Sequence, residues 1–149
     1  MSHKSQEKNM RKLADLLGRD LSYIWGERDS GPNGDKKVFL NMGKVFLRAL
    51  AKDLGLLDSK VSANPGGIAV SGECSLMGMW AHNGLYVQLS QPSYMRENVL
   101  LYRTIRHSRD YTGGVNLYLT RRNLETLSYP QLLSVLSAPR KEDPHERAA

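Results

Sequence analysis

The segment 106–111 groups side chains whose types are suited to chemistry. His107 is a candidate general base, Asp110 is placed to orient it, and Arg109 is placed to hold an anion. The same residues also suit an ordinary loop, in which Asp110 caps a turn and the arginines are solvated. Ser108 lacks the flanking pattern of a nucleophile elbow, so acyl chemistry is not expected. An enzyme using His107, Arg109 and Asp110 is the third of three hypotheses, and we favour a noncatalytic protein.

Tyrosines and arginines of the predicted strands form the leading candidate site. Side chains alternate between the two faces of a strand, so if Val99, Leu101 and Ile105 face the core, the tyrosines of this region face solvent. Exposed rings stack on bases and arginines pair with phosphate, although tyrosine is also simply a good strand former. The same assignment of faces points Arg103 toward the core. A buried arginine would then need an edge position, a bulge or a buried acidic partner. The predicted nucleic-acid-binding residues are Tyr86, Tyr102, Tyr118, Arg103, Arg106, Arg109, Arg121 and Arg122.

The charge distribution supports a polyanionic partner, DNA or RNA. The net charge is +6, from 21 basic and 15 acidic residues. Residues 61–95 carry a single charge, Glu73, whereas residues 96–122 carry six arginines against Glu97 and Asp110. A basic excess of this size is also common in proteins that bind nothing acidic. We therefore place nucleic-acid binding first among the hypotheses on the combination of charge and tyrosines.

Met77 and Met79 indicate a second hypothesis, a protein-binding inhibitor or adaptor. Both fall on the solvent parity of a nearly uncharged strand, where flexible thioethers suit a partner contact. The alternative is that another segment, such as the C-terminal helix, covers them, because large exposed apolar patches are uncommon on monomers.

No cofactor or metal is expected. The histidines His3, His82, His107 and His145 are scattered without the spacing of metal ligands. Cys74 is the one cysteine, lies on the inward parity of its strand and is predicted to be a core residue. A single cysteine and the absence of a signal core or a membrane-length apolar run favour a cytoplasmic protein with no membrane contact.

The elements that must position these residues follow from hydrophobic periodicity. Apolar residues recur at helical spacing near both ends of the chain and alternate with period two between them. The fold class is therefore α+β, with two N-terminal helices packed on a four- or five-stranded antiparallel meander and a short C-terminal helix. We expect one domain over 1–138 and a mobile charged tail over 139–149. The predicted helices are 6–25, 36–54 and 128–136, and the predicted strands are 60–63, 68–80, 85–90, 99–107 and 115–119.

Three segments resemble a known group of proteins. They are the residues 66–73 (Gly-Gly-Ile-Ala-Val-Ser-Gly-Glu), 84–90 (Gly-Leu-Tyr-Val-Gln-Leu-Ser) and 110–114 (Asp-Tyr-Thr-Gly-Gly). Together they are similar to the central segments of small uncharacterised proteins of bacterial plasmids and other mobile elements, over about residues 36–136. The resemblance implies an accessory role in bacteria. That group has no assigned activity, so it implies no functional residues.

Overall fold

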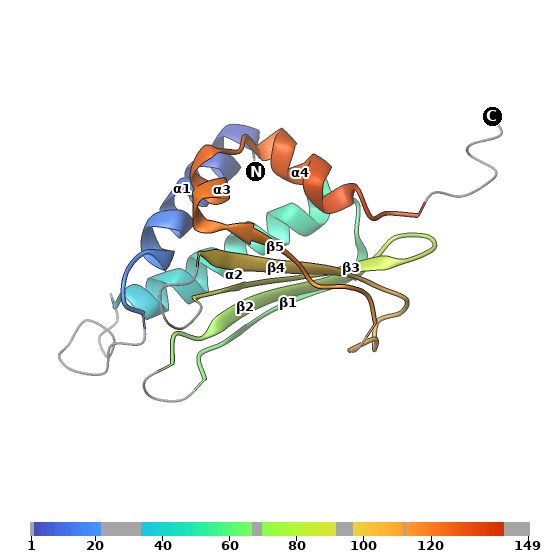
Figure 1. The fold of residues 1–149 in the computed structure, drawn as a ribbon, viewed down its shortest axis with the longest axis horizontal. Helices are drawn as coiled ribbons and strands as arrows, with labels where there is room; N and C mark the ends of the chain where they lie inside the picture. Colours follow the sequence, from blue (N-terminus) through green and yellow to red (C-terminus); the bar gives the residue numbers. More distant parts are fainter. Residues whose placement is uncertain (1, 22–33, 67–69, 92–96, 112, 142–149) are drawn as a thin grey trace.

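The computed structural model describes residues 2–21, 34–66, 70–91, 97–111 and 113–141 (Figure 1). Two helices are followed by five strands and then by two short helices, which confirms the predicted α+β class. None of the described helices is long and apolar enough to cross a membrane. The elements are α1 (His3–Leu17), α2 (Asp35–Asp53), β1 (Leu57–Asn64), β2 (Glu73–Met79), β3 (Gly84–Ser90), β4 (Asn98–Ile105), β5 (Leu117–Thr120), α3 (Arg121–Thr126) and α4 (Tyr129–Ser137).

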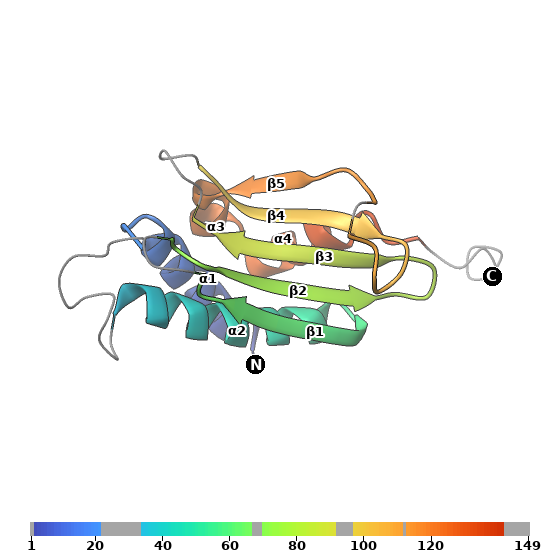
Figure 2. The same ribbon diagram turned by 90° about the horizontal axis from the view of Figure 1, so that it is seen from below.

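The sheet is an antiparallel meander in which the spatial order of the strands is their order in the chain, β1-β2-β3-β4-β5 (Figure 2). The hairpin predicted from Asn83-Gly84 joins β2 to β3, but its turn is residues 80–83, and Gly84 is the first residue of β3, paired with Met79. β1 is longer than the predicted strand 60–63, and its pairing with β2 is irregular between Leu57 and Lys60. The two edges of the sheet are therefore β1 and β5.

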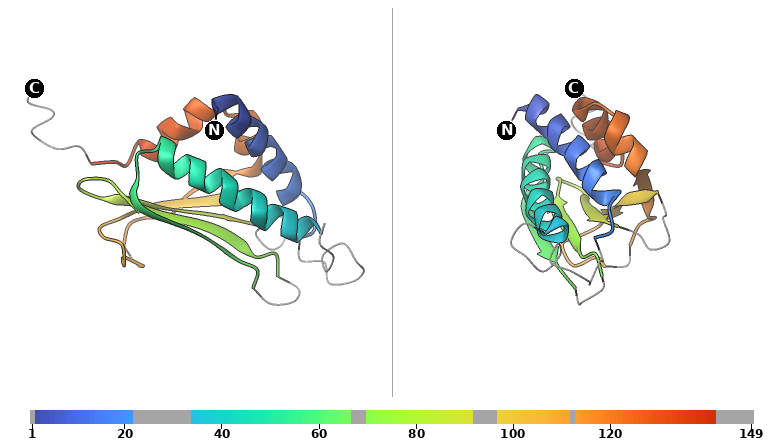
Figure 3. Two further views of the ribbon diagram at one scale, coloured as in Figure 1. Left: turned by 180° about the vertical axis from the view of Figure 1, so that it is seen from behind. Right: turned by 90° about the vertical axis from the view of Figure 1, so that its left-hand side faces the viewer.

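The helices cover one face of this sheet, which we call the inner face (Figures 1 and 3). Helix α2 packs directly on β1 and β2, and α1 contacts α2, α3 and α4. Helix α2 approaches β2 closely at Gly43, where an added Cβ would lie 2.5 Å from the Sγ of Cys74. Cys74 is fully buried there, as the sequence predicts. The apolar stripe of α1, including Met10 and Leu13, is also fully buried.

Helix α1 is shorter than predicted. Its C-cap is Gly18, and residues 22–25 of the predicted helix 6–25 lie outside the described residues. Ser2 caps its N-terminus by accepting a hydrogen bond from the backbone N–H of Ser5 at 3.1 Å.

Capping boxes begin both short C-terminal helices. The predicted box of Ser128 and Gln131 starts α4, and a second box of Thr120 and Asn123 starts α3, which the sequence analysis missed. Beyond α4, Asn83 donates to the carbonyl oxygen of Pro139 at 2.9 Å and accepts from the backbone N–H of Lys141 at 3.0 Å. The first residues of the predicted tail 139–149 are thus held against the β2–β3 turn, while residues 142–149 lie outside the described part of the chain.

Candidate binding surface on the outer face of the sheet

The outer face is the side of the sheet opposite the helices, and all four described helices lie on the other side (Figure 1). The strand register places Met77, Tyr86 and Arg103 side by side in one row across β2, β3 and β4. Among the described positions that the register pairs on this face, three carry charged side chains. The positions are Lys60, Ser62, Asn64, Glu73, Ser75, Met77, Met79, Tyr86, Gln88, Ser90, Leu101, Arg103, Ile105 and Tyr118.

Arg103 is buried between Tyr86 and the loop that follows β4. Its Nη1 donates to the carbonyl oxygen of Gly113 at 2.8 Å, and its Nη2 donates to the carbonyl oxygen of Asp110 at 3.1 Å. Its guanidinium carbon lies 5.1 Å from the centre of the Tyr86 ring, a cation–π contact. Burial is the largest cause that raises the pKa of Tyr86, so its hydroxyl stays protonated and donates to Gln88 Oε1 at 2.7 Å. Two predicted ligand-binding residues are thus bonded within the protein.

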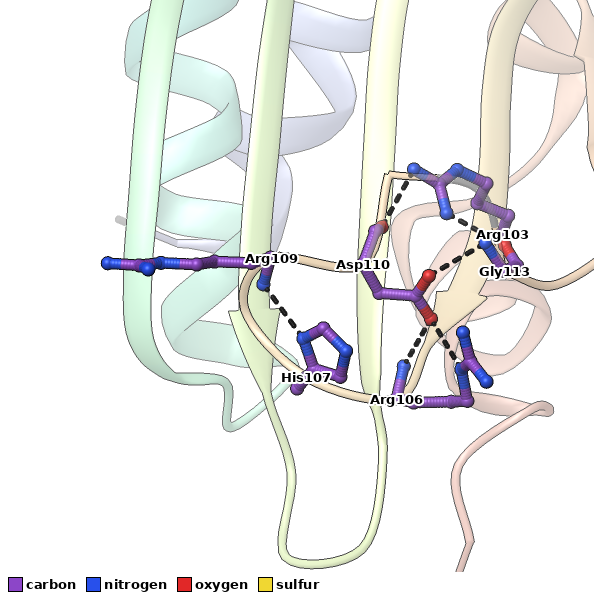
Figure 4. Close-up of polar contacts among 6 residues, drawn as sticks. All are labelled: Arg103, Arg106, His107, Arg109, Asp110 and Gly113. Atoms are coloured by element: carbon purple, nitrogen blue, oxygen red, sulfur yellow. Dashed lines mark hydrogen bonds and ion pairs between the residues drawn. The ribbon is translucent and has the colours of Figure 1, made fainter.

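The Asp110 carboxylate organises the β4–β5 loop (residues 106–116). Its Oδ2 accepts hydrogen bonds from the backbone N–H and the Nε of Arg106, at 3.0 and 3.1 Å, and its Oδ1 accepts from the backbone N–H of Gly113 at 2.7 Å (Figure 4). A Cβ added at Gly113 would lie 2.3 Å from this carboxylate, so only glycine allows the approach. The side-chain hydrogen bond from Arg106, together with these backbone N–H groups, holds the pKa of Asp110 well below its usual value.

The predicted base and its orienting acid do not meet. Asp110 directs its carboxylate to Arg106 and Gly113, whereas His107 uses Nδ1 to accept the backbone N–H of Arg109 at 3.2 Å (Figure 4). His107 and Arg109 are both exposed, and Figure 4 shows the Arg109 side chain extending away from the Asp110 cluster. The loop has the geometry expected of a structural turn.

Tyr102 faces inward, so the prediction that it points to solvent is wrong. Leu100 pairs with Leu89 and Tyr102 pairs with Val87, which places Leu100 and Tyr102 on the inner face. Arg103, predicted to turn inward, faces outward instead. The alternation of apolar and polar residues could not predict which face of β4 is buried, because apolar residues occur at both odd and even positions of this strand. They are Val99, Leu100, Leu101 and Ile105.

The remaining predicted arginines separate into two groups. Arg106 and Arg109 follow β4, at the end of the sheet where β5 begins. Arg121 and Arg122 lie in the first turn of α3, at the opposite end of β5, and Arg121 forms an ion pair with Glu125 at 3.5 Å. Arg96 lies outside the described residues. Within the described part of this stretch, these four arginines therefore lie at both ends of β5 and do not form a single patch.

Met77 and Met79 lie half-buried on the outer face, the parity that the sequence predicts. The alternative prediction was that the C-terminal helix covers these two methionines. Helix α4 does not cover them, because it lies on the inner side of the sheet (Figure 1). Tyr118 is also on this face and is 49% exposed. The two methionines on β2 and Tyr118 on β5 lie on opposite sides of the outer face, and no described helix covers them.

Among the described residues no group of three or more His, Cys, Asp or Glu side chains is placed to hold a metal ion. Burial, the largest cause, raises the pKa of the Cys74 thiol to about 12, so it is protonated and unreactive at neutral pH.

The edge strand β5 is a surface that the sequence analysis did not identify. Leu117, next to Tyr118, is 44% exposed, and Tyr111 and Val115 before it are more exposed still. Residues 111–120 contain no charge, although charged residues bound them on both sides. In the sequence, this uncharged and apolar interval between two groups of arginines could have indicated an exposed edge strand.

Comparison of the chain with protein-family models, with curated proteins and with solved structures finds no match.

Proposed function

We propose that this chain is a noncatalytic binding protein whose outer face docks a protein partner, in the manner of an inhibitor or adaptor. The observation that carries this is the outer face of the five-stranded sheet, which the described helices leave uncovered. Its paired positions carry apolar and uncharged polar side chains and few charges, and Arg103 and Ile105 are buried next to the β4–β5 loop. Faces with these properties are typical of protein–protein contact. The exposed arginines at its margin, Arg106 and Arg109, favour a partner with acidic residues around an apolar centre.

Nucleic-acid binding is the second candidate. Arg109 and Arg122 are exposed, Tyr118 is half exposed, and the net charge of +6 favours a polyanion. Against it, Tyr102 is buried and Arg103 is bonded within the protein, so the row of stacking rings beside free arginines is not assembled. The protein partner is therefore the better-supported ligand.

A photo-crosslinking amino acid at Met77 tests the proposal, with the same probe at Val45 as the matched control. Val45 is an apolar residue of α2 that is 43% exposed on the opposite side of the molecule. A protein captured from cells by the Met77 probe but not by the Val45 probe is then purified and its affinity measured. We expect Met77→Ser to weaken this binding at least about tenfold and Val45→Ser to change it less than about twofold.

Equal capture by both probes, or equal affinity of the Met77→Ser variant, would overturn the proposal. Fluorescence anisotropy with labelled single-stranded DNA, duplex DNA and RNA at several salt concentrations decides the second candidate. Binding that weakens steeply with salt, and that Arg109→Ala and Arg122→Ala reduce, would replace the protein partner by nucleic acid.

A further inference from the structure

The two edges of the sheet differ in how they are protected. Edge strand β1 carries the charged residues Asp58 and Lys60 and an irregularity in its pairing, features that discourage another strand from adding to it. Edge strand β5 carries no charge, and Leu117 and Tyr118 expose an apolar side chain on each of its two faces. Only β5 therefore presents a bare edge.

The outward side of β5 is open. Figure 2 shows it as the outermost strand, with no described helix or strand beside it on that side. Alternate residues of an edge strand direct their N–H and C=O groups away from the sheet, where they are available to a further strand. The backbone N–H of Thr120 is an exception, because it donates to Asn123 Oδ1 at 2.8 Å, so the edge available to a further strand ends before Thr120. β4 extends beyond Tyr102, which pairs with the first residue of β5, and the chain before β5 lies against this end of β4 at Gly113 and Gly114.

Gly114 shows how closely that continuation follows β4. Its φ is +81°, and a Cβ added to it would lie 2.5 Å from the carbonyl oxygen of Thr104. Together with the hydrogen bonds that Gly113 makes to Arg103 and Asp110, this contact fixes the approach to β5. The edge from about 113 to 119 is thus held in place before any ligand arrives.

The charges at its ends specify the occupant. Arg106, whose side chain is 75% exposed, lies beside the start of β5, and Arg121 and Arg122 lie beside its end. A second copy paired through the same edge by a two-fold axis would bring the Arg106 end of one copy against the Arg121 and Arg122 end of the other. Arg106 pairs with Asp110 and Arg121 pairs with Glu125, which offsets part of this repulsion. The contact between guanidinium groups is still less favourable than contact with an added strand that has acidic residues at both ends.

We propose that an extended segment of the partner protein, apolar in its centre and acidic at both ends, adds to the sheet as a sixth strand beside β5. This inference rests on the proposed function, because it assigns how the partner is held. Main-chain hydrogen bonds supply the affinity, and the arginines at the two ends select the charge pattern and register.

The test uses labelled nine-residue peptides with a centre of alternating valine and threonine. One peptide carries two aspartates at each end, the second carries two lysines at each end, and the third has the aspartates but N-methyl groups on alternate central residues. At low salt we expect the first to bind at least about tenfold more tightly than either of the others. Binding of the first should increase the hydrogen-exchange protection of amides within 115–119, measured by NMR.

The matched protein variants are Arg122→Glu and Lys37→Glu. Both residues are exposed in the first turn of a helix, and both changes reverse one charge, but Lys37 lies on α2, which packs beneath the other edge of the sheet. We expect Arg122→Glu to weaken binding of the aspartate peptide at least about fivefold and Lys37→Glu to change it less than about twofold.

Absence of binding by the aspartate peptide, equal binding of the N-methylated peptide, or protection outside β5 would each overturn the strand addition. These failures are separate from failure of the proposed function. A partner that crosslinks through Met77 and is weakened by Met77→Ser, but leaves the β5 amides unprotected, would leave outer-face docking in place and remove only the sixth strand.

Discussion

The inner and outer faces of the sheet are built from the same strands and differ in how deeply their side chains are buried. On the inner face Leu76, Val87 and Leu89 are fully buried against the helices. On the outer face Met77 and Gln88, one residue away along the chain, are half-buried. Adjacent side chains of one strand point to opposite sides, so substitutions at neighbouring positions can test stability and the proposed binding separately.

The comparison predicts its largest effect at Leu76. Leu76→Ala removes a fully buried side chain and leaves a cavity between β2 and the helices, so we expect the free energy of unfolding to fall by about 2–5 kcal/mol. Urea unfolding followed by circular dichroism measures this loss. A loss below about 1 kcal/mol would show that the inner face is not the tightly packed one.

The next effect is expected where α2 meets β2. Gly43→Ala places a Cβ 2.5 Å from the Cys74 Sγ, so one of the two elements must shift, and we expect a loss of about 1–3 kcal/mol. Adding Cys74→Ala removes the sulfur and should recover part of that loss in a double-mutant cycle. Additive losses would contradict a direct contact between these residues.

A smaller effect, confined to low pH, is expected at Asp110 beside the outer face. Its pKa is lowered in the folded state, so it contributes stability above about pH 4, and this contribution is lost as the pH falls below that value. Asp110→Asn should therefore lower stability at neutral pH and flatten its dependence on pH in the acid range. Urea titrations between about pH 2 and 6 compare the two slopes, and parallel curves would mean that Asp110 does not carry the acid sensitivity.

The smallest effect on stability is expected at Met77. Met77→Ser changes a half-buried residue of the outer face, so we expect the free energy of unfolding to change by less than about 1 kcal/mol, in the same urea assay as Leu76→Ala. A loss comparable to that of Leu76→Ala would show that the two faces are equally important for folding, and would contradict the difference between them.

Much of the fold could be predicted from the sequence, because the patterns that indicate its helices and strands involve residues close together in the chain. The alternation in 73–79, the Asn83-Gly84 turn and the Ser128–Gln131 capping box each predicted the element that the structure contains. Helix α3 was missed because it has only six residues and a single buried apolar side chain, Leu124. A helix of that length has no detectable period.

The candidate site was less accessible, because it depends on which strand positions are opposite one another. Nothing near Tyr102 in the sequence states that it pairs with Val87, and that pairing turns it inward. The bonding of Arg103 likewise depends on carbonyl groups of Asp110 and Gly113, supplied by the loop that folds back onto β4. Side-chain type predicted which residues could bind a ligand, and tertiary contacts determined which of them are free to do so.

The chain-order arrangement of the strands allows the sheet to form step by step during folding. Every strand pairs with its neighbour in the chain, so the sheet can form by successive hairpins with short loop closures. Helix α1 cannot complete its contacts that way, because Arg11 donates to the carbonyl oxygen of Leu124, and Glu7 accepts the backbone N–H of Tyr129. During synthesis the apolar stripe of α1 must therefore wait for almost the whole chain before it is fully buried, which makes it the part of the nascent protein most in need of protection from aggregation.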